Sequence, residues 1–223
     1  MIEFVRLRQS MVDSQIRAND VTDPRILAAM LELPRERFAP EDRRGLAYID
    51  HNLPLRDTMA GKPGRYLMEP MVLAKLVQAL DIDAEDKVLD VGTATGYSAA
   101  LLGRLVRRVV ALEEDHGLAA AAASNLAELD AGNVTVVTGP LAAGWPAEKP
   151  YDAILVNGSV EVVPEALLIQ LAEGGRLAAV VRAGGAARAT IYTRVAGSVA
   201  ARQVFSAAAP PLPGFEAPKT FVF

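Results

Sequence analysis

The strongest constraint on the fold is a change of pattern near residue 86, after which short apolar runs alternate with alanine-rich segments. The apolar runs predict strands at 88–91, 109–113, 134–138, 153–157 and 177–182, and the segments between them predict helices at 97–106, 116–129 and 164–172. Strands that alternate with helices form a parallel sheet with helices on both faces. The pattern therefore predicts a doubly wound, mostly parallel α/β sheet.

Both ends of the chain depart from this alternation. After Gly184-Gly185 the helical segments stop, and runs at 189–195, 200–207 and 220–223 predict antiparallel strands at one end of the sheet. Asp23-Pro24 predicts the N-cap and first turn of a helix over 25–33. Further helical segments are predicted at 4–18, 41–48 and 71–80, and loops at 56–65 and 210–215. At 223 residues we expect one domain, with a helical N-terminal addition over 1–80 and an α/β core over 81–223.

Composition excludes several classes of function. The chain has no cysteine, which excludes disulfides and thiolate chemistry, and His51 and His116 are too far apart for a familiar zinc motif, so we expect no metal. A formal net charge of −4 without a basic stripe argues against a nucleic-acid partner. No apolar run is long enough to span a membrane and the first residues do not form a signal peptide, so we expect a cytoplasmic protein.

A glycine loop follows the first predicted strand of the core. It comprises Asp90, Gly92, Thr93, Ala94 and Gly96. Glycine permits the sharp turn and removes a side chain from the path of a ligand, and open parallel sheets bind ligands at this edge. The loop lacks the second and third glycines of a dinucleotide site and the Gly-Lys-Ser/Thr ending of a phosphate loop. An S-adenosylmethionine pattern fits better, at its acidic residue and two of its three glycines.

Glu113 strengthens the interpretation of this loop as a cofactor site. It stands at the end of the second predicted core strand, where a carboxylate can accept hydrogen bonds from both ribose hydroxyls. A tight turn followed by a surface glutamate would explain the same residues without a ligand. The order of strand, loop, helix, strand and acid favours the cofactor site.

Longer stretches of the chain, over most of residues 11–183, resemble the protein-L-isoaspartate O-methyltransferase family. The stretches that carry the resemblance are 11–16, 21–30, 34–40, 47–50, 53–55, 88–102, 144–146, 150–152 and 170–177. The resemblance implies the fold of class I S-adenosylmethionine-dependent methyltransferases. It also implies a protein-repair enzyme that transfers a methyl group from S-adenosylmethionine to the α-carboxylate of isoaspartyl residues in proteins or peptides.

The sequence departs from that family at two places. Where the family has Thr-Ile-Ser-Gln-Pro before a helix, this chain has Met68 in place of the serine that is expected to hold the substrate carboxylate, followed by Glu69. Where the family has Gly-Asp-Gly, this chain has Gly139-Pro140-Leu141, so the expected acceptor for the adenine amino group is missing. Gly139 and Leu141 remain candidates for cofactor contacts, through apolar packing and the Leu141 amide.

No catalytic residue is assigned from the sequence, but several side chains are candidates for the acceptor site. Arg56, Lys62 or Arg65 could replace the missing hydroxyl as a carboxylate clamp, although a solvated loop explains each of them singly. Glu69 could act as a general base, although an acid before a helix explains it better. The weaker candidates are Thr58, His51, Trp145, Asn157 and Ser159.

Three functions remain open at this point. The first is methylation of isoaspartyl carboxylates, and the second keeps the cofactor but uses another acceptor. The third is a non-catalytic relative that binds a ligand or partner, for which Met68 and Pro140 are the support. Binding of S-adenosylmethionine and methyl transfer to an isoaspartyl peptide would distinguish them.

Overall fold

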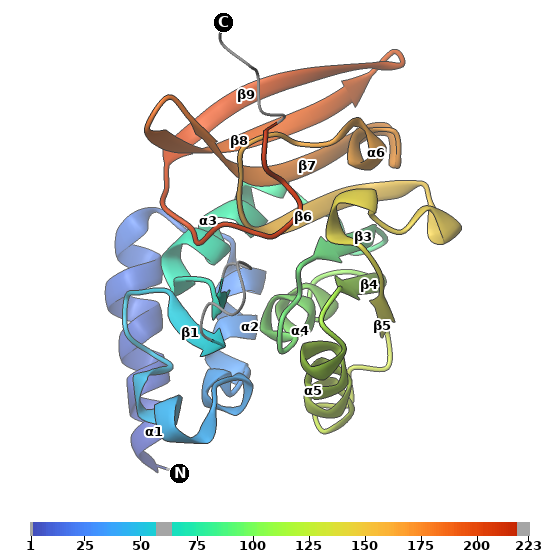
Figure 1. The fold of residues 1–223 in the computed structure, drawn as a ribbon. Coiled ribbons are helices and arrows are strands. Elements are labelled where there is room, and N and C mark those ends of the chain that lie inside the picture. Colours follow the sequence, from blue (N-terminus) through green and yellow to red (C-terminus); the bar gives the residue numbers. More distant parts are fainter. Residues whose placement is uncertain (1, 57–63, 218–223) are drawn as a thin grey trace, which may run out of the picture.

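The computed structural model of the protein describes residues 2–56 and 64–217. Its strands are β1 (Leu53–Arg56), β2 (Arg65–Leu67), β3 (Lys87–Val91), β4 (Arg108–Glu113), β5 (Val134–Thr138), β6 (Tyr151–Val160), β7 (Leu171–Ala183), β8 (Ala186–Val195) and β9 (Ser198–Ser206). Its α-helices are α1 (Ile2–Met11), α2 (Pro24–Glu32), α3 (Pro70–Leu80), α4 (Tyr97–Gly103), α5 (His116–Ala127) and α6 (Glu165–Leu168). Figure 1 shows the N-terminal elements, in blue and cyan, gathered beside the core.

The main sheet has the strand order β5-β4-β3-β6-β7-β8-β9. Each pair of neighbours from β5 to β7 in this order is parallel. The pairs β7–β8 and β8–β9 are antiparallel. From β3 the chain moves outward to β4 and β5 and then returns to the other side of β3 as β6, so the strand order reverses between β3 and β6. The predicted fold class is confirmed, and the reversal places a ligand-binding edge at the carboxyl ends of these strands.

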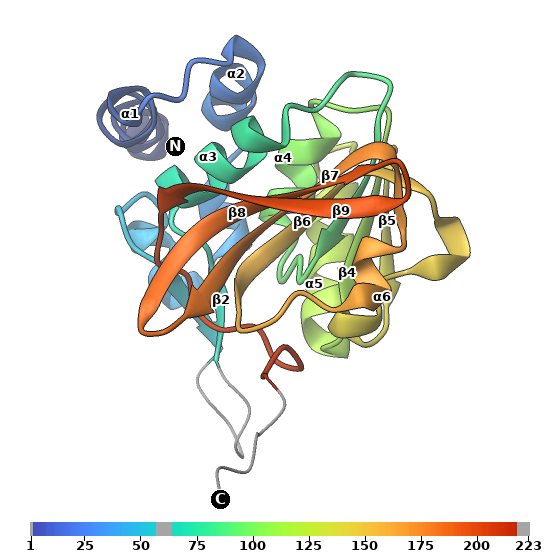
Figure 2. The ribbon, with the colours of Figure 1, turned by 90° about the horizontal axis from the view of Figure 1, so that it is seen from above.

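Helices and loops bury both faces of the sheet. On one face, apolar side chains of α2, α3 and α4 pack with strand residues such as Val88 and Ala153. On the other face, strand residues such as Leu89 and Ile154 pack with α6 and with Leu212 from the C-terminal segment. Figure 2 shows α3 and α4 between the N-terminal helices and the strands. The C-terminal segment therefore replaces helix packing over part of the second face.

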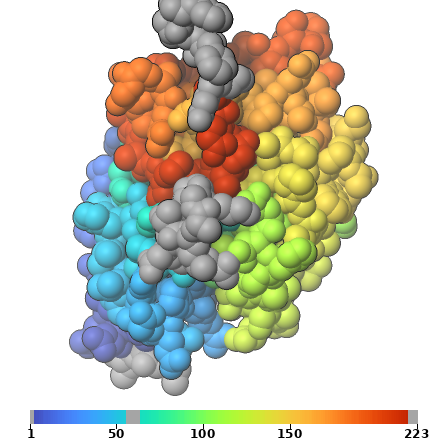
Figure 3. Space-filling model, in the orientation of Figure 1, coloured from blue at the N-terminus to red at the C-terminus, as the bar shows by residue number. Residues whose placement is uncertain are grey.

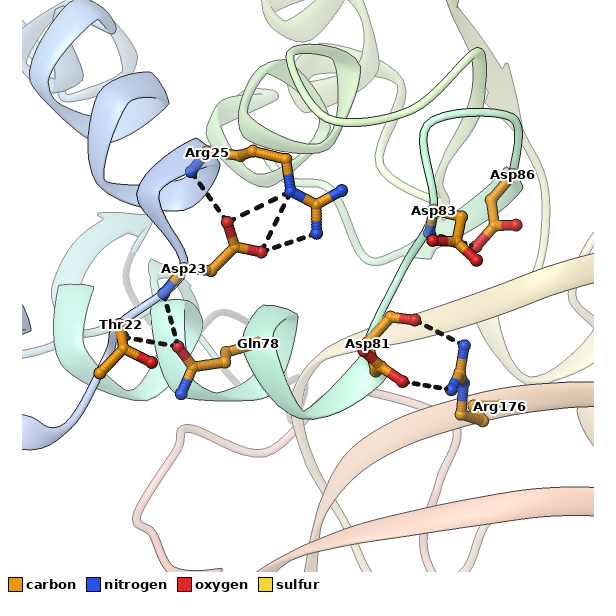
Figure 4. A network of polar contacts seen from close by, with 8 residues as sticks. All are labelled: Thr22, Asp23, Arg25, Gln78, Asp81, Asp83, Asp86 and Arg176. Carbon is orange, nitrogen blue, oxygen red and sulfur yellow. Dashed lines mark hydrogen bonds and ion pairs between the residues drawn. The ribbon is translucent and has the colours of Figure 1, made fainter.

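Polar contacts hold the C-terminal end of α3 against the segment before α2 and against the sheet, as Figure 4 shows. The Gln78 side chain of α3 accepts from the amides of Thr22 and Asp23 at 2.7 and 3.1 Å. Asp23 accepts from the Arg25 amide at 2.8 Å, which confirms the predicted N-cap of α2. Arg176 of β7 pairs with Asp81, directly after α3, at 2.9 Å.

Within the described residues, no helix is long and apolar enough to cross a membrane.

Several predicted elements have other bounds. The helix predicted over 4–18 is α-helical only to Met11 and continues as a π turn and a 3-10 turn to Asn19. The helix predicted over 41–48 is a 3-10 helix over Glu41–Leu46, and the one predicted over 97–106 ends at Gly103. The predicted strand 220–223 and most of the predicted loop 56–65 lie outside the described residues.

The helix predicted over 164–172 is present only as the short helix α6, so its predicted end was wrong. The Gln170 side chain explains the early end. Its amide donates to the carbonyls of Ala143 and Ala166, and its oxygen accepts from the Trp145 amide. The Gln170 carbonyl accepts from the Tyr151 amide, so the chain must already run beside β6 at this residue. These tertiary bonds override the local helical pattern.

Candidate functional site

The glycine loop makes a tight turn at the carboxyl end of β3. Gly92, Ala94 and Gly96 all have positive φ, at +81°, +53° and +97°. The amides of Gly92 and Thr93 both donate to the Leu112 carbonyl of β4, at 2.9 and 3.2 Å. These bonds fix the turn against the neighbouring strand and bring it to the end of β4.

Side chains of the protein itself pack into the space where the glycines lack a β-carbon. A β-carbon on Gly96 would lie 3.2 Å from the β-carbon of Ala122, so this glycine lets α4 approach α5. A β-carbon on Gly92 would lie 3.1 Å from Cδ2 of Leu212, and one on Gly158 would lie 2.5 Å from Cγ of the same leucine. The space above the glycine turn is therefore filled by Leu212, which the sequence placed only in a connector.

Glu113, at the end of β4, is fully buried and faces the glycine turn. Its Oε2 accepts from the Ala94 amide at 2.8 Å, and its Oε1 accepts from the amides of Glu114 and Asp115 at 3.0 and 3.1 Å. The loop and the acid that the sequence singled out separately thus share a hydrogen bond. Three backbone donors therefore fix the position of this carboxylate.

Arg65, from β2 of the N-terminal addition, completes this arrangement. Its Nη1 and Nη2 donate to Oε1 and Oε2 of Glu113 at 2.5 and 2.7 Å, a bidentate ion pair. Only 8% of the arginine side chain and none of the glutamate side chain are exposed. The clamp-like pairing that the sequence offered for Arg65 toward a substrate is made here with an internal carboxylate.

A second polar cluster lies beside the turn. Ser98 of α4 donates to Oδ2 of Asp90 at 2.6 Å, and the Asn157 side chain of β6 donates to the Ser98 hydroxyl at 2.8 Å. Burial raises the pKa of Asp90 to about 6, and the Ser98 hydrogen bond opposes that shift. Asn157, at the end of the predicted strand 153–157, and Ser159, just beyond it, both belong to β6.

The site has buried polar groups that a ligand could satisfy, and a small cavity lies beside them. Asp90 Oδ1, Asn157 Oδ1 and Ser159 Oγ are buried without a hydrogen-bond partner. The cavity between β2, β6 and the C-terminal segment measures about 10 Å³, and its lining includes Arg65, Asn157 and Leu212. That volume holds about one water molecule. The donor and acceptor set fits a polar cofactor, which this cavity alone could take only if Arg65 or Leu212 moved.

The region expected to meet adenine lies after β5. The Gly139 amide donates to the Glu113 backbone carbonyl at 3.2 Å, and a β-carbon on Gly139 would lie 3.4 Å from the Trp145 ring. The side chain of Leu141 is buried in the apolar core on that face of the sheet. Trp145 therefore packs on this turn, and the contacts predicted for Gly139 and Leu141 stay predictions.

The segment before α3 is buried around Arg35. This arginine donates to the carbonyls of Ala47 and Met68, both at 2.7 Å, and lies 4.7 Å over the Tyr97 ring. Met68 lines the cavity and has no donor for a carboxylate. Desolvation raises the pKa of the neighbouring Glu69, and the charge of Asp50 adds to the shift.

The remaining candidates are exposed or lie outside the described residues. His51 and His116 are exposed, and His116 begins α5. Thr58 and Lys62 lie outside the described residues, as does the side chain of Arg56. Among the described residues no group of three or more histidine or acidic side chains could hold a metal ion.

Sequence reasoning missed Leu212 and left Arg65 undecided, and each had a weak signal. Arg65 alternates with the apolar Leu67 in a short extended segment, which puts both side chains on one face. Leu212 is an apolar residue between prolines, in a segment with no helical or strand pattern.

Figure 3 shows the red C-terminal segment in the middle of the face, between the blue and cyan N-terminal region and the yellow and green core.

Comparison with known proteins gives one consistent family. Residues 6–213 match the family model described as protein-L-isoaspartate(D-aspartate) O-methyltransferase. A protein-L-isoaspartate O-methyltransferase 2 of Pelobacter propionicus is 40% identical over 170 residues, which cover 76% of this chain and 73% of that protein. A protein-L-isoaspartate O-methyltransferase of Rhodopseudomonas palustris is 44% identical over 167 residues, or 75% and 74% of the two chains.

Solved structures agree with this result. A structure described as protein-L-isoaspartate O-methyltransferase superposes with a TM-score of 0.81 at 26% identity, covering 93% of this chain and 66% of the other. A putative protein-L-isoaspartate O-methyltransferase from Plasmodium falciparum, in complex with S-adenosyl-L-homocysteine, has a TM-score of 0.76. At 19% identity, with 92% and 97% of the chains covered, that likeness supports the fold alone.

Proposed function

Because this chain belongs to the protein-L-isoaspartate(D-aspartate) O-methyltransferase family, we propose that it methylates the α-carboxylate of isoaspartyl residues with S-adenosylmethionine. Membership of the family confirms the sequence resemblance, and with it the methyltransferase activity and the cofactor that the resemblance implied. The acceptor class is protein or peptide, in line with protein repair. The cytoplasmic location and the exact acceptor stay predictions.

One observation carries the assignment of the cofactor site, namely that Glu113 faces the glycine turn and shares a hydrogen bond with Ala94. We assign the ribose hydroxyls to the Glu113 carboxylate and the remaining cofactor contacts to the turn at Gly92, Thr93 and Gly96. Asp90 and the buried oxygens without partners near it support a polar ligand at this edge. A cradle of this kind positions a ligand without the anion-binding backbone that a diphosphate needs.

For methyl transfer to a carboxylate, the protein mainly has to position the two reactants. S-adenosylmethionine supplies an electrophilic methyl group and leaves as a neutral thioether. The attacking oxygen belongs to a carboxylate that is already charged, so the reaction requires neither a general base nor a proton transfer. The chain's contribution is to align the acceptor and to exclude water, for which the buried walls formed by Met68 and Leu212 are suited.

Calorimetry with S-adenosylhomocysteine tests the assignment of Glu113. We expect Glu113→Gln to weaken binding by about 1–3 kcal/mol, because charge-assisted hydrogen bonds to the ligand are lost. Glu128→Gln is the control, since Glu128 also pairs with an arginine but at an exposed site. Affinity equal to that of the wild type both in Glu113→Gln and in Arg65→Met, which removes the cation paired with Glu113, takes this residue out of the cofactor site.

Methyl transfer to an isoaspartyl peptide, with the matching aspartyl peptide as control, tests the acceptor. Transfer to the isoaspartyl peptide alone supports the proposal. Binding of the cofactor without transfer to either peptide favours another acceptor, and Met68 is the residue that favours this outcome. Failure to bind the cofactor at all contradicts the proposed function and favours a non-catalytic relative.

A further inference from the structure

The Glu113 carboxylate has no acceptor capacity left for a ligand. Its two oxygens receive five hydrogen bonds, two from Arg65 and three from the amides of Ala94, Glu114 and Asp115. A carboxylate offers about four lone-pair positions. The amide donors are fixed by the glycine turn and the end of β4. If the ribose of the cofactor binds Glu113, as the proposed function holds, Arg65 is the donor that can leave.

Arg65 cannot leave without finding another anion. Its side chain is 8% exposed, and removing the partner of a buried charge is strongly unfavourable. Among the described residues that line the adjacent cavity, Arg65 is the only charged one; the others are Gly64, Tyr66, Met68, Asn157, Pro210, Pro211 and Leu212. A released guanidinium at this place would face the cavity next to Met68, whose described lining residues offer it no carboxylate.

The acceptor of the methyl group is itself a carboxylate. Guanidinium binds carboxylates in bidentate fashion, and Arg65 already makes this geometry with Glu113. The negative charges of Asp90 and Glu69 nearby would otherwise disfavour an anionic acceptor. Met68 provides no donor where a hydroxyl is expected, so a cation is needed to hold that substrate.

We propose that Arg65 exchanges partners during the reaction cycle, leaving Glu113 when the cofactor binds there and then holding the carboxylate of the isoaspartyl acceptor. This inference rests on the proposed function. It assigns a substrate-binding role to Arg65 and makes binding ordered, with the cofactor first. It also makes opening of the Arg65–Glu113 ion pair a cost that weakens cofactor binding.

The variant Arg65→Met tests both the release of Glu113 and the binding of the acceptor carboxylate, because methionine keeps much of the apolar stem and removes the charge. We expect S-adenosylhomocysteine to bind at least about tenfold tighter by calorimetry, since no ion pair has to open. We expect the KM for an isoaspartyl peptide to rise by about tenfold or more, because its carboxylate loses the guanidinium. Effects of opposite sign on two ligands are not produced by a merely structural residue.

Arg108→Met is the matched control, because Arg108 also pairs with a glutamate, Glu148, at 2.7 Å. Arg108 begins strand β4, whereas Glu113 ends it. Arg108→Met should change neither binding constant. Arg65→Lys covers the case in which Arg65→Met does not fold. Lysine keeps the charge but cannot bridge both oxygens of Glu113, so cofactor binding should again tighten while the peptide KM rises less than in Arg65→Met.

The outcomes separate this inference from the proposed function. Equal S-adenosylhomocysteine affinity in the wild type and the Arg65 variants, or weaker affinity in the variants, overturns the exchange while the cofactor assignment stands. Tighter cofactor binding with an unchanged peptide KM overturns the acceptor role of Arg65. If neither the wild type nor any Arg65 variant binds S-adenosylhomocysteine at millimolar concentration, the proposed function and the exchange both fail.

Discussion

Ionisation of Asp90 should lower the stability of the protein, and Asp90→Asn isolates this effect. The Asp90 side chain is fully buried, with Oδ2 bonded to Ser98 and Oδ1 without a partner. Burial raises its pKa from the usual 3.8 to about 6; the charge of Glu113 adds to the shift, and that of Arg65 opposes it. An asparagine keeps the acceptor for Ser98 and carries no charge at any pH.

The sign follows from proton linkage. The folded-state pKa lies above the unfolded value, so the folded protein holds the proton more tightly and its stability falls as the pH rises from about 4 toward 7. With pKa values of 3.8 and about 6, the free energy of unfolding falls by about 0.6 kcal/mol at pH 4 and by about 3 kcal/mol at pH 7, relative to the fully protonated group. Replacement by asparagine should remove this pH-dependent loss.

Urea unfolding at pH 4.5, 5.5 and 7 measures the free energy of unfolding of both proteins. We expect Asp90→Asn to gain about 2 kcal/mol on the wild type as the pH rises across this range. Asp130→Asn, at an exposed aspartate, is the control and should leave the pH dependence unchanged. A difference between Asp90→Asn and wild type that stays constant with pH would refute the reasoning, because the carboxylate would then be ionised without penalty.

Two further substitutions test the walls of the site. Leu212→Ala should lower the free energy of unfolding by about 2–3 kcal/mol, because it empties the packed space above Gly92 and Gly158; a loss below about 0.5 kcal/mol in urea unfolding would show that the C-terminal segment does not pack there. Arg35→Met should cost about 2–4 kcal/mol, since two buried carbonyls lose their charged donor, and an unchanged melting temperature by circular dichroism would contradict the role of Arg35.

The parts of the fold that depend on local pattern could be predicted from the sequence. Strand and helix alternation gave the parallel sheet, and Asp23 gave the start of α2, because neighbouring residues alone decide these features. The end predicted for the helix over 164–172 was wrong because Gln170 forms bonds with segments that are distant in sequence.

The same distinction applies to the candidate site. Asp90 and Glu113 could be placed at one edge because the carboxyl ends of adjacent parallel strands meet there. The pairing of Arg65 with Glu113 could not be predicted, because it depends on how the N-terminal addition docks on the core. The position of Leu212 depends on the path of a segment without regular structure, which no periodicity describes.

The close approach of α4 to α5 at Gly96 affects how mutants of this loop should be interpreted. A methyl group at this position meets Ala122, and one at Gly92 meets Leu212, whether or not any small molecule is present. Loss of activity in Gly96→Ala or Gly92→Ala would consequently report damaged helix or side-chain packing as readily as damaged ligand contacts. The glycine signature could thus persist in a descendant that had stopped methylating anything, because folding alone would preserve it.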